Sequence, residues 1–73
     1  MRDVDIMADR ILRACEDKHI SVRTAAMRCG IPETTMYQVT GRKGELSCRN
    51  LRKLCRSMHV SADWLLGLDG GAK

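Results

Sequence analysis

The chain has 73 residues, so we expect a single domain over residues 1–73 with no room for a separate catalytic domain. Hydrophobic residues make up 44% and charged residues 30%, which is typical of a globular rather than a disordered chain. Thirteen Lys and Arg residues against nine Asp and Glu residues give a net charge of +4, which favours a polyanionic partner.

Charged residues interrupt the start of the chain: Asp3, Asp5, Asp9 and Arg10 leave no apolar run for a signal peptide. No stretch approaches the roughly 20 apolar residues that a membrane span requires. We therefore expect a cytoplasmic protein with no membrane partner.

The four cysteines, Cys15, Cys29, Cys48 and Cys55, show no Cys-x-x-Cys spacing. A zinc site built from them, with His19 or His59, would need ligands from distant segments. Because a reducing cytosol also disfavours disulfides, we expect four small buried hydrophobic side chains and no metal.

The first predicted helix spans about residues 5–18, with apolar side chains at steps of three or four. These are Met7, Ile11, Ala14, Cys15 and the aliphatic stem of Lys18. Asp3 or Asp5 is expected to cap its start. His19 follows where a positive φ is often required, and histidine tolerates that conformation better than most residues.

The second and third predicted helices, about residues 22–29 and 32–40, are joined by a sharp turn at Gly30. Ser21 is a suitable N-cap. Gly30 accepts the left-handed conformation without a Cβ clash, so it can end the helix just before Pro32. The inward-facing set is Val22, Ala25, Ala26, Cys29, Ile31, Met36 and Val39. The outer face of the third helix carries Glu33, Thr34, Tyr37 and Gln38.

After the third helix we expect a mobile basic loop, Arg42-Lys43-Gly44. Ser47 then caps a fourth helix over about residues 47–58, and Ser61 caps a short fifth over about residues 61–66. The apolar set of the fourth helix is Cys48, Leu51, Leu54, Cys55 and Met58, and its outer face carries Arg49, Arg52, Lys53 and Arg56. For Arg52, Lys53 and Arg56 we expect only a solvated face.

His59 repeats the helix-ending role of His19, Trp64 is expected to pack in the core against Leu54 and Met58, and residues 68–73 are expected to fray. No strand alternation appears anywhere in the sequence. The five helices and their short links therefore predict an all-α bundle.

Several parts of the sequence together resemble the phage repressor and Cro family of helix-turn-helix proteins, also called the XRE type, from about Met7 to Gly67. They are residues 16–21, Ala25-Ala26, Cys29-Gly30-Ile31, Thr35-Met36-Tyr37 and the closing segment 54–67. The resemblance implies a five-helix, lambda-repressor-like DNA-binding domain. Its third helix would enter the major groove, and its second would lie across the phosphate backbone.

The resemblance also implies partners. Such proteins usually repress transcription as dimers on near-palindromic double-stranded operators, with half-sites about 34 Å apart. We expect a homodimer formed through the C-terminal helix around Trp64, in a phage-like or mobile-element regulator.

By position, the resemblance assigns base contacts to Glu33, Thr34, Tyr37 and Gln38. For Tyr37 a phosphate contact or no contact remains open, and for Glu33 so does a role in complementing the helix dipole. The expected backbone contacts are Ser21, Arg23, Thr24, Arg42, Lys43, Arg49 and Asn50.

The sequence departs from the family pattern beside the second helix and between the first and third. Val22 stands where the family often has Gln, and Cys15 and Thr40 stand where many members have an Arg–Glu ion pair. Val22 and Glu33 keep a second hypothesis open: a protein-interaction module, such as an antitoxin or a regulator of another repressor, with weak or no operator binding.

No catalytic constellation is visible. The sequence has no plausibly spaced Ser-His-Asp set and no Gly-rich phosphate loop opening a helix, so we expect no enzyme activity, cofactor or small-molecule ligand.

Overall fold

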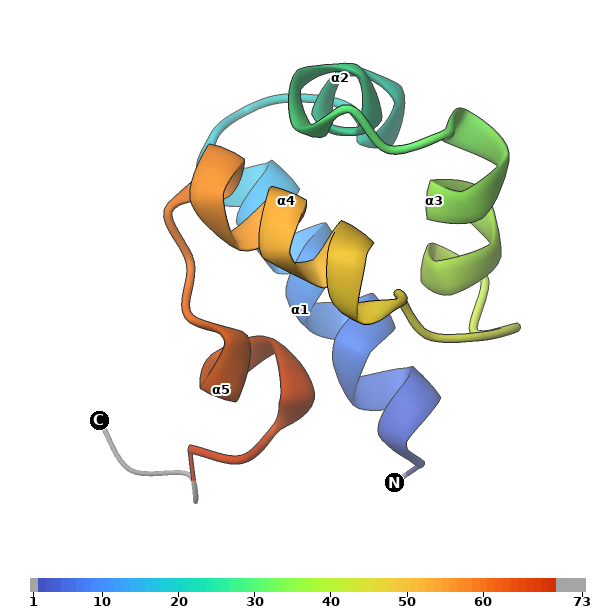
Figure 1. The fold of residues 1–73 in the computed structure, drawn as a ribbon, viewed down its shortest axis with the longest axis vertical. Coiled ribbons are helices and arrows are strands. Elements are labelled where there is room, and N and C mark those ends of the chain that lie inside the picture. The colour runs from blue at the N-terminus through green and yellow to red at the C-terminus, as the bar shows by residue number, and fades with distance from the viewer. Residues whose placement is uncertain (1, 70–73) are drawn as a thin grey trace.

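The computed structural model describes residues 2–69, which form five α-helices and no strand (Figure 1). The helices are α1 (Asp3–Asp17), α2 (Val22–Cys29), α3 (Glu33–Thr40), α4 (Cys48–Met58) and α5 (Ala62–Leu66). The all-helical prediction is therefore confirmed for the described part of the chain. Residues 70–73 of the predicted frayed tail lie outside it. No helix within residues 2–69 is long and apolar enough to cross a membrane.

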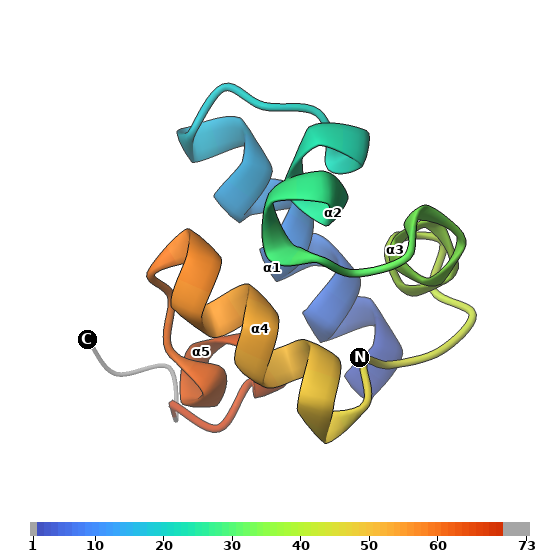
Figure 2. The ribbon, with the colours of Figure 1, turned by 45° about the horizontal axis from the view of Figure 1, so that its top comes forward.

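Helix α1 is the central element of the bundle. It packs against α2, α3 and α5, whereas α4 packs mainly against α2 and also against α5. Figure 2 shows α3 and α5 on opposite sides of α4. The outer faces of α3 and of the α4–α5 pair are therefore separate surfaces.

The core is built from aliphatic and sulfur-containing side chains contributed by every helix. The largest fully buried ones are Met7, Ile11, Met36, Val39, Leu54, Met58 and Leu65. Ala25 and Ala26 are also buried, and their small side chains let α2 approach its neighbours closely. Removing most of a buried Met or Leu side chain from such a core costs about 2–5 kcal/mol.

Serine caps and left-handed residues define the helix ends. Ser21, Ser47 and Ser61 each accept a hydrogen bond from the backbone N–H three residues later, at 3.0, 3.3 and 3.0 Å. Each cap contributes about 1 kcal/mol. His19 and His59 both adopt a φ of 56°, as predicted. The sequence predicts these helix ends correctly because serine capping and the positive φ of histidine depend on the residue itself and its near neighbours.

The start of α1 differs from the prediction. Arg2 occupies the N-cap, so neither Asp3 nor Asp5 caps the helix. Asp5 is instead the third helical residue, and its Oδ2 accepts a hydrogen bond from the Arg2 backbone N–H at 3.2 Å. The carboxylate thus satisfies a free amide from inside the first turn.

Cys48 is exposed, contrary to its predicted place in the core. Leu54 and Met58 define the buried side of α4, and at 3.6 residues per turn Cys48 lies about 100° around the helix from the middle of that side. Leu51 and Cys55 lie closer to it and are partly buried. The predicted apolar face of α4 was therefore too wide.

Further corrections concern single side chains. Lys18 is exposed rather than part of the apolar face, and Trp64 packs only partly buried against the core. Fraying does not extend to residues 68 and 69, because the Leu68 N–H donates to the Asp63 carbonyl at 2.8 Å and Asp69 pairs with Arg10 at 3.3 Å.

Candidate nucleic-acid interface

The turn between α2 and α3 is built around Gly30, whose φ is 71° and ψ 29°. The Ile31 N–H returns to the Ala26 carbonyl at 3.0 Å, and the Ile31 side chain is buried. A Cβ on Gly30 would meet nothing within 4 Å. Glycine is therefore favoured here by its backbone conformation and not by lack of space.

Helix α3 separates a buried side from a polar outer side. Met36 and Val39 are 0% and 2% exposed, whereas all four predicted base contacts are exposed. Among residues 2–69, the side chains of Thr34, Tyr37 and Gln38 make no hydrogen bond or ion pair. The outer face of α3 thus presents two polar groups and a phenol ring that are available to a partner.

Glu33 is the member of this face with a partner inside the protein. Its Oε1 lies 3.6 Å from Nε of Arg23, so the pair connects the first turn of α3 to the start of α2. The carboxylate also lies in the first turn of α3, where a negative charge is favourable. Because both side chains are exposed, the ion pair is weak and can open when a ligand competes for either group.

The predicted backbone contacts other than Arg42 lie in three places. Ser21 and Thr24 form a hydrogen-bonded pair at the start of α2, where Ser21 Oγ donates to Thr24 Oγ1 at 3.0 Å. Lys43 is exposed in the loop after α3, while Arg49 and Asn50 lie in the first turn of α4.

Arg42 is held by two carboxylates of α1. Its Nε lies 3.1 Å from Oδ1 of Asp5, and its Nη2 pairs with Oδ1 of Asp9. Arg42 itself adopts a φ of 65°. A hydrogen bond from Arg2 and the nearby positive charge of Arg42 lower the pKa of Asp5. Within the basic loop Arg42-Lys43-Gly44, the Arg42 side chain is therefore paired with α1.

The Arg42 cluster supplies a charged contact that Cys15 and Thr40 do not. Cys15 is buried, and the Thr40 hydroxyl donates to the Met36 carbonyl at 3.1 Å, so these two residues form no charged pair. A charged contact nevertheless joins α1 to the segment after α3, through the Arg42 cluster. The sequence indicated this contact only through the spacing of Asp5 and Asp9, which places the two carboxylates one helical turn apart on the same face of α1.

Two α4 side chains hold the end of α2, which sequence reasoning missed. Lys53 Nζ donates to the Gly30 carbonyl at 3.2 Å, and Ser57 Oγ donates to the Arg28 carbonyl at 3.2 Å. The carbonyls at a helix C-terminus lack partners within the helix and carry a partial negative charge. Lys53 was predicted to lie only on a solvated face, but its ammonium group binds the turn between α2 and α3.

The cysteines differ in environment. Burial raises the pKa of the Cys15, Cys29 and Cys55 thiols, whereas Cys48 is exposed. Within residues 2–69, no group of three or more His, Cys, Asp or Glu side chains is arranged to hold a metal ion.

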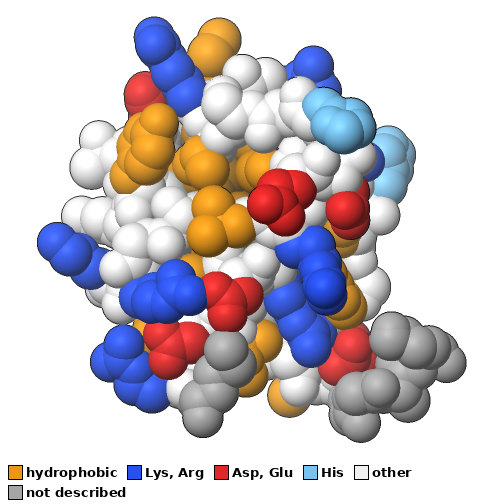
Figure 3. Space-filling view, turned by 180° about the vertical axis from the view of Figure 1, so that it is seen from behind, with side chains coloured by type: hydrophobic (Ala, Val, Ile, Leu, Met, Phe, Trp, Pro, Cys, Tyr) orange, Lys and Arg blue, Asp and Glu red, His pale blue; other side chains and the backbone are white. Residues whose placement is uncertain are grey.

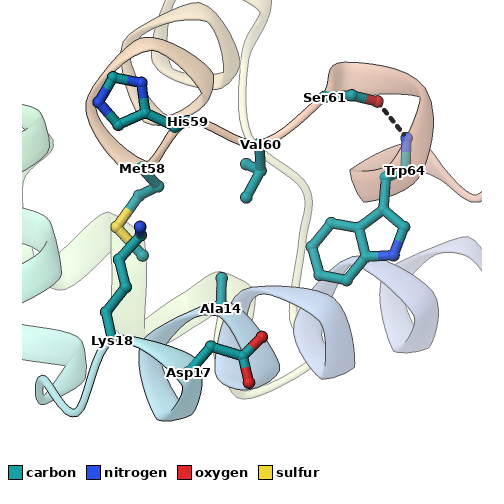
Figure 4. Close-up of a pocket in the computed structure, with 8 residues that line it drawn as sticks. All are labelled: Ala14, Asp17, Lys18, Met58, His59, Val60, Ser61 and Trp64. Atoms are coloured by element: carbon teal, nitrogen blue, oxygen red, sulfur yellow. Dashed lines mark hydrogen bonds between the residues drawn. The ribbon is translucent and has the colours of Figure 1, made fainter.

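A cavity of about 250 Å³ lies between the C-terminal end of α1 and the α4–α5 connection (Figure 4). Val60 and the Trp64 indole project toward it, while the His59 ring points away. Arg10 stacks on Trp64, with its guanidinium carbon 5.4 Å from the ring centroid. Trp64 therefore joins α5 to α1.

Charge is distributed unevenly over the surface. The face opposite α4 mixes acidic and basic side chains (Figure 3). Helix α4 carries Arg49, Arg52, Lys53 and Arg56 and no acidic residue. The positive charge of the chain is thus concentrated on α4 rather than on α3.

Residues 2–69 thus form an all-helical unit in which a glycine turn joins two short helices and the second presents an exposed polar face. Comparisons with protein-family models, curated proteins and solved structures found no match to this chain.

Proposed function

We propose that the protein is a sequence-specific double-stranded DNA-binding transcriptional regulator with a lambda-repressor-like fold. In this proposal α2 and α3 are the helix-turn-helix, and α3 enters the major groove. The observation that carries it is the division of α3 into a buried side, Met36 and Val39, and an exposed polar side directly after the Gly30 turn.

The exposed side of α3 has chemistry suited to base recognition. A glutamine amide can pair with adenine, and a threonine methyl group can contact thymine. Gln38 and Thr34 have no partner within residues 2–69, so they bind a base without first breaking an internal contact. Glu33 reaches a cytosine amino group only after its ion pair with Arg23 opens.

Phosphate contacts come from the loop after α3 and from the starts of α2 and α4. Lys43 is the loop residue best suited to this role, because it is exposed and Arg42 is already paired with Asp5 and Asp9. Arg49 and Asn50 follow in α4, and Ser21 and Thr24 lie at the start of α2.

The proposed assembly is a cytoplasmic homodimer on a near-palindromic operator, acting as a repressor of the phage or mobile-element type. The segment around α5 is its contact surface. Trp64 is partly buried against α1, and Leu68 just after the helix is 69% exposed. An exposed leucine four residues after a partly buried tryptophan would give two copies apolar side chains to bury.

Selection of bound sequences from a random duplex pool tests this function. The expected product is a palindromic consensus, bound with an affinity that falls steeply as salt rises, because phosphate contacts release counterions. Failure to enrich any sequence would contradict the proposal, whether or not random-sequence duplex binds at low salt.

Internal ion pairs favour a second candidate, a protein-interaction module with weak or no operator binding. Arg23, Glu33 and Arg42 are all paired within the protein, and Val22 offers no polar group. A chain of this kind would bind duplex DNA without sequence preference or not at all. The same selection therefore separates the two functions.

A further inference from the structure

A groove of about 350 Å³ lies on the outer side of α4, where α5 approaches it. Leu51, Cys55, Cys48 and Ala62 supply apolar side chains to its lining. Arg52 and Arg56 line it as well. We call this feature the α4–α5 groove.

The arginines beside the α4–α5 groove belong to the unpaired arginines of residues 2–69, which also include Arg13, Arg28 and Arg49. Arg10, Arg23 and Arg42 are paired with acidic side chains. Within residues 2–69, Arg52 and Arg56 have no ion-pair or hydrogen-bonding partner. Each presents a planar guanidinium that binds a carboxylate through two parallel hydrogen bonds.

We propose that the α4–α5 groove binds an acidic amphipathic segment of a partner protein. An apolar side chain of that segment occupies the space over Leu51 and Cys55, and flanking carboxylates pair with Arg52 and Arg56. This is the arrangement of a helix or short peptide laid into a hydrophobic groove, with charge complementarity at its edge.

Charge argues against two other occupants. A two-fold contact between copies through this face would bring Arg52 and Arg56 close to the same arginines of the second copy, and like charges repel. A nucleic-acid backbone would satisfy the arginines but would leave the apolar lining without a matching group. An acidic segment with an apolar anchor matches both parts of the surface.

The groove lies away from the proposed base-reading face on α3, whereas the proposed phosphate contacts Arg49 and Asn50 lie between Cys48 and Leu51 of its lining. No residue of α3 lines the groove, and α3 and α5 lie on opposite sides of α4 (Figure 2). The inference therefore does not rest on the proposed DNA-binding function.

Peptide selection with a charge-reversal variant tests the proposal. A random peptide library is displayed to the full 73-residue protein, and enriched sequences are synthesised and measured by fluorescence anisotropy. We expect a leucine- or isoleucine-containing core flanked by Asp or Glu. The double variant R52E/R56E should weaken these peptides about tenfold or more, because two attractive charge pairs become repulsive.

The matched control is R13E/R28E, which changes net charge equally at two exposed arginines outside the groove. It should retain wild-type peptide affinity within about twofold, which is under about 0.5 kcal/mol. Thermal melts verify that both variants fold. Bound peptide should also slow alkylation of Cys48, which is exposed and lines the groove.

Three results would overturn the inference. These are no acidic-apolar enrichment, equal weakening by the two double variants, and no protection of Cys48. Binding of a random-sequence duplex at low salt distinguishes the nucleic-acid occupant. If R52E/R56E reduces duplex affinity far more than R13E/R28E does, the arginines belong to a DNA interface and the proposal fails.

Discussion

Arg42 Nε lies 3.1 Å from Asp5 Oδ1, which connects the segment after α3 to the first turn of α1. Asp9 pairs with the same guanidinium from one helical turn further along. These contacts hold one end of α3 against α1. At its other end, Lys53 braces the Gly30 turn. The proposed recognition helix is therefore positioned by polar contacts at both ends as well as by its buried side chains.

The contacts of Arg42 predict that substitutions at Arg42 and Asp9 lower the stability of the protein, whereas a substitution at Lys43 weakens DNA binding. Arg42→Ala should lower the thermal unfolding midpoint, and Asp9→Asn should do so by a smaller amount, because each removes a contact between α1 and the loop. Lys43→Ala, the neighbouring control, should leave the midpoint unchanged and weaken duplex binding. If Arg42→Ala instead melts like the wild type and weakens DNA binding as Lys43→Ala does, Arg42 is a phosphate contact.

Asp5 predicts a pH dependence at the acidic end. Its pKa is lowered in the folded state below its ordinary value of 3.8. Its contribution to stability is therefore fully present above about pH 4 and is lost as the pH falls through the lowered pKa. Urea unfolding from neutral to strongly acidic pH should show a shallower acidic decline for Asp5→Asn than for the wild type. Parallel curves would mean that Asp5 is not stabilised in its charged form.

Gln38 and Lys43 should affect DNA binding differently. Gln38→Ala should remove discrimination worth about 1–3 kcal/mol at one base pair, because the amide is proposed to recognise a base edge. Lys43→Ala should weaken all sequences alike and reduce the salt slope by about one. Competition binding with single-base operator variants makes the measurement. Equal, sequence-independent losses from both variants would show that Gln38 does not recognise a base.

Gly30→Val should destabilise the protein through its backbone alone. The left-handed conformation costs a residue with a Cβ about 1–2 kcal/mol, and a β-branched side chain more. No neighbour would clash with the new Cβ. Gly44→Ala is the matched control, because Gly44 also has open space and lacks a positive φ. Chemical denaturation should place Gly30→Val well below both the control and the wild type, and coincident curves would contradict this account.

The cysteines should react with a thiol reagent in a defined order. Cys48 is exposed and should be modified first, Cys55 more slowly, and Cys15 and Cys29 only when the protein opens. Burial raises the pKa of the latter three thiols, which further reduces their thiolate fraction near neutral pH. Mass spectrometry of the partially labelled protein identifies the sites. Early modification of Cys15 would show that the α1 core opens readily.

The sequence by itself determined the local structure of this protein. The serine caps, the positive φ of Gly30 and of both histidines, and the buried side of α3 depend on nearest-neighbour chemistry and helical period, so the printed residues contain that information. The exposure of Thr34, Tyr37 and Gln38 follows from the same period.

Only the tertiary structure decided which charged side chains have partners. Arg42 meets Asp5 and Asp9 across more than 30 residues of chain, and Lys53 reaches the Gly30 carbonyl from another helix. Helical periodicity cannot predict such contacts, because they depend on how the helices cross in the folded protein. For the same reason the sequence could not distinguish Arg52 and Arg56, which remain unpaired beside an apolar groove, from Lys53 on the same helix.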